Sequence, residues 1–319
     1  AAPAVFGAPA VQFLDLPAPP GGDAAERGLR IAAWAKPWRS QAIHASPETT
    51  GFVRRATAAR PATTGELVAP LAPGLEGRVM RGADLIVRLN DGELSSVSRA
   101  RLLNGANAAA VGAGAGGWEV LQFESAEEIS ASVWRLTGLL RGQSGTGDQA
   151  ATGAPEGAAF VLLDAAVVPA GLAASEVGLL LNWRVGPSGR DLSPAHCVEE
   201  QIAGGVRARM PLSPVHIRAT RTEAGDWTLS WIRRGRVDAD AWDGAEIPLG
   251  ENAESYRIDI GPPGGPTLRS ATAAEPGWIY AAAHLAADFA SLPAEAEIAV
   301  RQLGAGGWGL PGVARMTFN

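Results

Sequence analysis

Residues 214–236 read PVHIRATRTEAGDWTLSWIRRGR, and this stretch predicts two neighbouring strands of a β-sandwich with a tryptophan in the core. Apolar and polar residues alternate on either side of a turn at Glu223–Asp226, and Trp231 falls on the inward phase of the second run. The outward face is expected to carry the arginines Arg218, Arg221, Arg233, Arg234 and Arg236. No catalytic-looking cluster stands among them, which indicates a module for recognition or assembly.

The composition fits a chain of several domains without a strong charge. Its 319 residues suffice for two or three domains, each with its own core, and the net charge of −6 favours neither a nucleic-acid binder nor a membrane-surface binder. Lys36 is the single lysine, so nearly all cations are arginines. Cys197 is the single cysteine, which excludes an intrachain disulfide. No apolar run is long enough to span a bilayer.

Residues 1–60 are expected to form an extended arm and linker with one strand segment. Residues 1–28 are rich in Ala, Pro and Gly, and we interpret them as an arm that docks on something larger. The strand candidate is LRIAAW at 29–34. The chain begins AAPAVFGAPA, without Met and without the charged start of a signal peptide, so we expect a fragment of a longer polypeptide.

Residues 61–210 are expected to form an irregular β-domain, because Gly and Pro separate short alternating runs. Asp91-Gly92 is typical of a hairpin turn. For residues 126–140 a helix is the weaker alternative, since Gly138 and the β-branched residues disfavour it. The expected strands are 84–90, 118–123, 132–140, 159–163 and 177–185.

Residues 211–319 are expected to form a C-terminal sandwich. Pro211 and Pro214 open the segment and stop strand pairing there. No segment with helical period is secure, and Ala281–Phe289 could form a short helix. The expected strands are 216–219, 227–233, 255–260, 278–282, 298–302 and 313–318. The whole chain is therefore predicted to be all-β.

This last segment resembles a fibronectin type III module. The resemblance rests on a Pro-led first strand, Trp231 in the second strand and Tyr256 in a Y-x-I-x-I third strand. It continues in V-x-Q at Val300–Gln302, before a Gly-rich turn. The chain departs from the pattern at Ala296, where such modules usually carry a tyrosine that pins the corner.

A second resemblance covers roughly residues 100–260. The L-L-R-G-Q-x-G-T signature at Leu139–Thr146 and the R-R-x-R-x-x-A-x-x-W pattern at Arg233–Trp242 carry it. These runs resemble the C-terminal part of the siphophage-like "host specificity" or megatron proteins at the tail tip of alphaproteobacterial gene transfer agents. Further matching runs are LNGANAAAVG (103–112), WEVLQF (118–123) and PLGENAESYRIDI (248–260).

The second resemblance implies a structural baseplate or hub protein of a phage-like particle, active in tail-tip assembly and in attachment to the host cell. It also implies a homotrimer, contacts with other tail-tip proteins, and a glycan or receptor on the host surface as a partner. The expected location is the tail tip, assembled in the bacterial cytoplasm and extracellular after release. In that family a domain related to glycoside hydrolases precedes this region, so hydrolase activity is expected elsewhere in the polypeptide.

Two glycine-rich runs and one His-Cys pair could suggest binding chemistry. Gly112–Gly117 (GAGAGG) and Gly142–Gly147 (GQSGTG) lack the Lys-Ser/Thr and the helix of a phosphate-binding loop, so we interpret both as turns. His196-Cys197 adjoins two glutamates but lacks the three or four spaced ligands of a zinc site. No metal or cofactor is therefore expected.

Four carboxylates gather in a short segment, at Asp238, Asp240, Asp243 and Glu246. They could serve glycoside chemistry or bind Ca²⁺, but a solvated loop with arginine partners is favoured. No G-x-S-x-G motif is present. We assign no catalytic residue and expect no enzyme.

The candidate interaction surface combines arginines with tryptophans outside the expected core. Arginine stacks well on aromatic rings, and such pairs suit carbohydrate or protein surfaces. The candidates are Arg233, Arg234, Arg236, Trp242, Trp278 and Trp308. As an alternative function, these aromatics would make a carbohydrate-binding module for cell-surface glycans. A glycosidase that uses residues 238–246 ranks last, because no acid/base pair is visible on a scaffold that excludes water.

Overall fold

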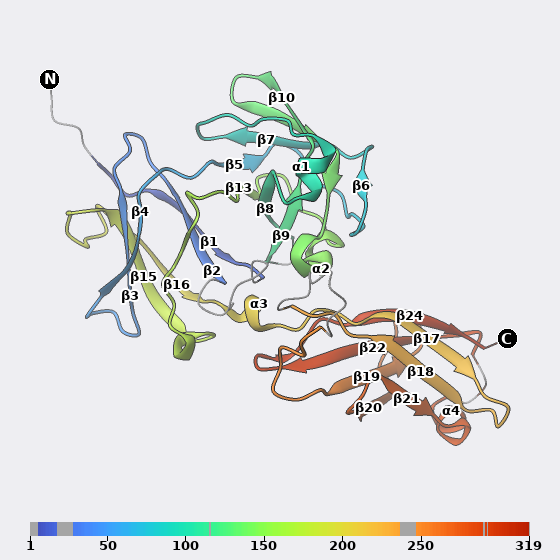
Figure 1. Cartoon of the computed structure of the whole chain (residues 1–319). Helices are drawn as coiled ribbons and strands as arrows, with labels where there is room; N and C mark the ends of the chain where they lie inside the picture. The colour runs from blue at the N-terminus through green and yellow to red at the C-terminus, as the bar shows by residue number, and fades with distance from the viewer. Residues whose placement is uncertain are drawn as a thin grey trace, which may run out of the picture. The chain divides into compact units, whose positions relative to one another are not determined.

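A computed structural model describes residues 6–17, 28–114, 116–236, 247–289, 291 and 293–318. These residues form an all-β chain with a few short helices, as expected (Figure 1). They divide into two compact units, one up to Ala208 and one from Arg209 onward. The boundary lies within a few residues of the expected start of the C-terminal sandwich at 211.

The first unit begins with residues that we expected to be an arm and linker. Instead, residues 10–58 contribute four strands to two sheets of the unit. β1 (Ala10–Asp15) pairs antiparallel with β2 (Leu29–Trp34), and β2 also pairs with β14 (Val168–Pro169). The apolar patch at the start of the chain therefore finds its partner within the same chain.

A four-stranded sheet packs against this three-stranded sheet. Ile31 of β2, Ile43 and Trp183 are buried in the core between them. The four strands, in sheet order, are β16 (Val198–Ala203), β15 (Leu180–Pro187), β3 (Gln41–Ser46) and β4 (Val53–Ala58). Together the two sheets form a small sandwich.

The third layer of the first unit is a nine-stranded antiparallel sheet. Its strands, in sheet order, are β10 (Ser125–Ser130), β11 (Val133–Thr137), β7 (Leu85–Leu89), β5 (Thr64–Leu67), β13 (Ala159–Leu162), β8 (Ala108–Gly112), β9 (Trp118–Gln122), β12 (Leu139–Leu140) and β6 (Val79–Met80). β8 and β9 form a hairpin across Gly112–Gly117, which confirms the turn expected there.

The central strands of this sheet are covered on both faces, which explains their continuous apolar runs. In β8, Ala109 and Val111 face one core, and Ala110 faces the other, which lies against β1 and β2. In β13, Phe160 and Val161 divide between the same two cores. β2 therefore contributes side chains to two cores, one on each of its faces, and the middle strands of the nine-stranded sheet do the same.

The helices are short and sit in connections. They are α1 (Arg99–Leu103), α2 (Gly147–Ala150), α3 (Val206–Arg209) and α4 (Ala282–Asp288), with 3-10 turns at Gln143–Gly145 and Ala174–Glu176. Within the described part of the chain, no helix combines the length and apolar character needed to cross a bilayer. Residues 125–130 and 133–137 are strands, so the strand interpretation of 126–140 is confirmed. Asp91-Gly92 does not close a hairpin, because β7 pairs with β5 and β11 and the chain continues into α1.

The second unit is a sandwich of two antiparallel sheets. Trp231, Tyr256 and Ile298 lie in its core, as do Leu229 and Ala296. One sheet contains, in this order, β17 (Val215–Arg221), β18 (Trp227–Ile232) and β21 (Gly277–Tyr280). The other contains, in this order, β20 (Arg269–Ala273), β19 (Tyr256–Gly261), β22 (Glu295–Gly304) and β24 (Gly312–Thr317), with β23 (Gly307–Trp308) folded back on β22.

The opening stretch of sequence behaves as expected. β17 and β18 pair antiparallel across the turn at Glu223–Asp226, and Trp231 is buried edge-on against Tyr256, with ring centroids 5.1 Å apart. Ile232, the next residue along β18, is 57% exposed. The two neighbours therefore occupy opposite faces of one strand, as the period of two requires.

Trp231→Ala should lower the free energy of unfolding of the second unit by about 3–5 kcal/mol, because it leaves a cavity in the core. Ile232→Ala on the same strand should change it by about 0.5 kcal/mol or less. Urea unfolding of both variants measures the difference. Equal effects of the two substitutions would show that Trp231 is not a core residue.

Candidate interaction surface

The loops at one end of the C-terminal sandwich hold most of the sequence-predicted interaction residues. Tyr256 pairs with Gln302 and contacts Trp231, so the segment after β18 and the hairpin after β22 leave the core at the same end. Glu251 joins the two loops, since its carboxylate accepts a hydrogen bond from the backbone N–H of Ala305 at 3.1 Å. The structure thus brings the loop of Arg233–Arg236 close to the hairpin that carries Trp308.

Arg233 and Arg234 are half-buried and donate to neighbouring backbone groups. Arg233 Nη1 lies 3.0 Å from the carbonyl oxygen of Pro248, and its Nη2 lies 2.5 Å from that of Ile247. Arg234 Nε donates to the carbonyl oxygen of Ser213 at 2.8 Å, and its Nη2 donates to the hydroxyl of Ser213 at 2.6 Å. These contacts fasten the loop after β18 to segments that are far from it in sequence.

Arg236 forms a largely buried ion pair with Glu251. Its Nε lies 2.6 Å from Glu251 Oε1, and the two side chains are only 16% and 2% exposed. Arg236 also donates to the carbonyl oxygen of Gly250 at 3.0 Å. The expectation of an outward-facing run therefore needs correction at 233–236, because these three guanidinium groups are engaged inside the loop end. Arg218 and Arg221 of β17 are exposed, as expected.

The three candidate tryptophans differ in their surroundings. Trp278 lies opposite the buried Leu229 and stacks on Tyr280, with ring centroids 5.7 Å apart and planes at 22°. Trp308 is half-buried in β23 opposite Leu303. Trp242 lies outside the described residues. Trp278 thus contributes to the edge of the core, and Trp308 keeps part of its surface free.

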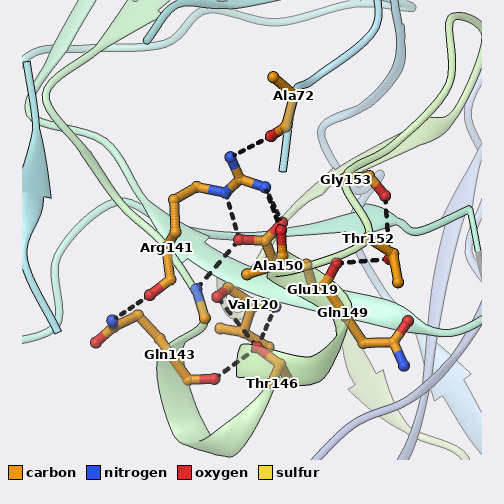
Figure 2. Close-up of polar contacts among 11 residues, drawn as sticks. Ala72, Glu119, Val120, Arg141, Gln143, Thr146, Gln149, Ala150, Thr152 and Gly153 are labelled. Atoms are coloured by element: carbon orange, nitrogen blue, oxygen red, sulfur yellow. Dashed lines mark hydrogen bonds and ion pairs between the residues drawn. The ribbon is translucent and has the colours of Figure 1, made fainter. Parts of the chain in front are cut away.

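The signature at Leu139–Thr146 is built around a buried ion pair (Figure 2). Arg141 Nε lies 2.5 Å from Glu119 Oε1 and Arg141 Nη2 lies 2.7 Å from Glu119 Oε2, in a two-pronged contact. The side chains are 0% and 1% exposed. Arg141 Nη1 also donates to the carbonyl oxygen of Ala72 at 3.0 Å. Such a pair is stable only when further hydrogen bonds satisfy both groups, as they do here.

The rest of the signature completes this cluster. The backbone N–H of Gly142 donates to Glu119 Oε1 at 3.1 Å, and Gly142 has a φ of 63°, which favours glycine. The Thr146 hydroxyl is buried, accepts from the N–H of Val120 at 3.0 Å and donates to the carbonyl oxygen of Gln143 at 2.8 Å. The motif that carries the resemblance therefore secures a turn against β9 and is not itself a recognition surface.

The His196-Cys197 segment forms a turn. Asp191 Oδ1 lies 3.2 Å from His196 Nδ1, and the Ser193 hydroxyl lies 3.3 Å from the same nitrogen. Hydrogen bonds from Ser193 and then His196 hold the pKa of Asp191 below its usual range. Because the hydroxyl and the carboxylate share one ring nitrogen, this trio lacks the relay geometry of a serine hydrolase. Burial raises the pKa of the Cys197 thiol.

The other candidates for metal binding or catalysis do not form a site among the described residues. Among the described residues, no group of three or more His, Cys, Asp or Glu side chains is placed to hold a metal ion. The carboxylates at Asp238, Asp240, Asp243 and Glu246 lie outside the described residues. Gly142–Gly147 leads from β12 into the 3-10 turn and α2, which agrees with its interpretation as a turn.

Comparison with known proteins finds one family. Residues 62–161 match the family described as "Rcc01698-like, C-terminal". This segment coincides with the nine-stranded sheet, from the residues before β5 to the end of β13. It contains both Glu119 and Arg141. No curated protein matches the chain.

Several solved structures match the chain at low sequence identity and low TM-score. The rat CD45 extracellular region, domains d3-d4, is 10% identical at a TM-score of 0.25; the match covers 40% of this chain and 59% of that chain. A segment of two fibronectin type III domains from chicken tenascin is 9% identical at 0.24, over 78% and 99% of the chains. The chicken CNTN1 FN1-FN3 domains are 8% identical at 0.26, over 98% of both.

Arg141→Met should lower the free energy of unfolding of the first unit by about 3–5 kcal/mol, because it leaves the Glu119 carboxylate buried without a counter-charge. The matched control is Arg88→Met, which removes an ion pair with Glu66 that is about half exposed. That control should cost about 1 kcal/mol or less. Urea unfolding followed by tryptophan fluorescence measures both.

The double variant Arg141→Met/Glu119→Met should recover much of the loss, since it removes both buried charges. If Arg141→Met is as mild as Arg88→Met, the buried pair does not hold the sheet together.

Cys197 should resist alkylation in the folded protein at neutral pH, because burial both shields the thiol and raises its pKa. Iodoacetamide labelling followed by mass spectrometry should show slow modification, and rapid modification after urea is added. Labelling at equal rates in both conditions would contradict this placement.

Proposed function

We propose that this chain is a structural component of the tail tip of a phage-like particle. The observation that carries the proposal is that the family match and the Leu139–Thr146 signature fall in the same segment, residues 62–161. The segment that matches the Rcc01698-like family is the nine-stranded sheet, and the Leu139–Thr146 signature, which resembles tail-tip proteins of gene transfer agents, lies in the buried Arg141–Glu119 cluster inside it.

The second unit supports an architectural role. It is a fibronectin type III-like sandwich whose loop end is fastened by internal arginine contacts, such as the pair of Arg236 with Glu251. A sandwich of this kind offers rigid faces and edges for contact with other proteins. Contacts with other tail-tip or hub proteins, and with a receptor on the host surface, belong to the proposal.

A homotrimer around the tail axis is also part of the proposal. It comes from the resemblance alone, because the arm at residues 1–28 no longer supports it. Ala10–Asp15 of that segment pairs with β2 of its own chain. A trimer would therefore form through surfaces of folded units.

Recognition of glycans through the aromatic residues remains a prediction, with fewer candidate tryptophans than the sequence indicated. Trp278 stacks on Tyr280 at the edge of the core, and the half-buried Trp308 is the described candidate that keeps part of its surface free, whereas Trp242 lies outside the described residues. Glycan arrays with Trp308→Ala and Trp242→Ala, beside Trp278→Ala, would show whether either tryptophan contributes.

Immunogold electron microscopy of purified particles tests the tail-tip proposal directly. Antibodies against this chain should label one end of the tail. The variant Arg141→Met should yield fewer particles with a complete tip, whereas Arg88→Met should assemble normally. Labelling of heads, or particles that lack the chain altogether, would overturn the proposal.

A further inference from the structure

A cavity of about 310 Å³ lies within the first unit. This volume is at the small end of the range found for ligand pockets, about 300–1,000 Å³. Segments far apart in the sequence form it: β1, the β8–β9 turn, α2 and the end of β16. Its lining includes Phe13, Asp15, Leu29, Trp118, Ile202 and Arg207.

One wall of the cavity is polar and centred on the carboxylate of Asp15. Its Oδ1 accepts from the backbone N–H of Gly205 at 2.9 Å, and its Oδ2 accepts from the backbone N–H of Arg207 at 3.3 Å. Each oxygen has a second lone pair for another donor. Burial raises the pKa of Asp15, although these hydrogen bonds and the nearby charge of Arg207 act to lower it.

The neighbouring cation, Arg207, makes its direct ion pair with a different carboxylate. Arg207 directs its guanidinium to Asp148, with Nη1 at 3.0 Å from Oδ2 and Nη2 at 2.5 Å from Oδ1, and also to the carbonyl oxygen of Gly145. Although burial alone would raise it, the hydrogen bonds from Arg207 hold the pKa of Asp148 below its ordinary value. Asp15, Asp148 and Arg207 together carry one net negative charge, and of these three Asp15 and Arg207 line the cavity.

The rest of the lining includes apolar and aromatic side chains. These are Phe13, Leu29, Ile202 and Trp118. The indole N–H of Trp118 donates to the carbonyl oxygen of Phe13 at 3.0 Å, which fixes the ring beside β1. Aromatic rings near a carboxylate favour a cation, because the ring faces attract positive charge. An aliphatic stem would in turn remove these apolar side chains from water.

We propose that this cavity binds a guanidinium or primary ammonium group on an aliphatic stem, with Asp15 as its counter-charge. The same chemistry could come from a free small molecule or from an arginine side chain of a second copy of this chain. Arginine is the abundant cation here, with Lys36 the single lysine. This inference is independent of the tail-tip role, since it rests on the lining of the cavity alone.

Agmatine, an alkylguanidine, is the probe, and the full chain is titrated with it by isothermal calorimetry or NMR. Asp15→Asn should weaken binding by about tenfold or more, because it removes the charge but keeps an oxygen for the N–H of Gly205. Asp84→Asn, an equal charge change on an exposed carboxylate of the same unit, should leave binding unchanged. Thermal unfolding checks that both variants are folded.

Binding should also strengthen as the pH rises through the pKa of Asp15, because only the ionised carboxylate pairs with the cation. An uncharged aliphatic compound, 3-methylbutanol, should bind more weakly than agmatine. No binding of agmatine at millimolar concentration, or binding that Asp15→Asn leaves unchanged, would overturn the proposal. So would equal binding of the neutral alcohol.

Sedimentation distinguishes the two sources of the ligand. If agmatine dissociates an oligomer of the wild-type chain, and Asp15→Asn lacks that oligomer, the natural occupant is an arginine of a second copy. If the oligomeric state is unaffected while agmatine binds, the occupant is a free alkyl cation. Either result keeps the proposed chemistry.

Discussion

A charge removed from water must meet an opposite charge and hydrogen-bond partners, and the first unit satisfies this constraint at Arg141 and Glu119. The ion pair links β9 to the turn after β12, and through the carbonyl oxygen of Ala72 it reaches a third segment. The turn after β12 and the segment around Ala72 have little regular structure of their own to hold them in place. The position of the turn, and with it one end of the nine-stranded sheet, depends on a contact between two side chains.

Arginine plays this part repeatedly. Arg207 joins Asp148 and Gly145, Arg236 joins Glu251, and Arg234 joins Ser213. A guanidinium offers five donors in a planar fork, so it can bind a carboxylate and a carbonyl at once, which lysine cannot match. The arginine-rich composition first suggested a surface for partners. In the folded chain, several of these arginines instead form hydrogen bonds and ion pairs that hold irregular loops in place.

Sequence patterns predicted the second unit better than the first. The strands around Trp231 and Tyr256 alternate clearly, because one face is buried and the other meets solvent. β1, β3 and β16 were not predicted as strands, since their sequences alternate weakly. For Arg141, an arginine within an apolar run was a signal of burial, but its partner Glu119 could not be identified without the fold. Asp15 and Arg207 gave no local signal, because the cavity forms only when distant segments meet.

The pairing of β3 with β15 has a consequence for synthesis of the protein. Asn182 lies beside Ser46, 136 residues earlier in the chain. A ribosome adds about 5–20 residues per second, so the early strands wait roughly ten seconds before their partners emerge. During that interval their apolar faces and free edges are open to wrong pairings, which is when a chaperone would be needed. The C-terminal sandwich, whose strands pair over shorter separations, closes soon after it leaves the ribosome.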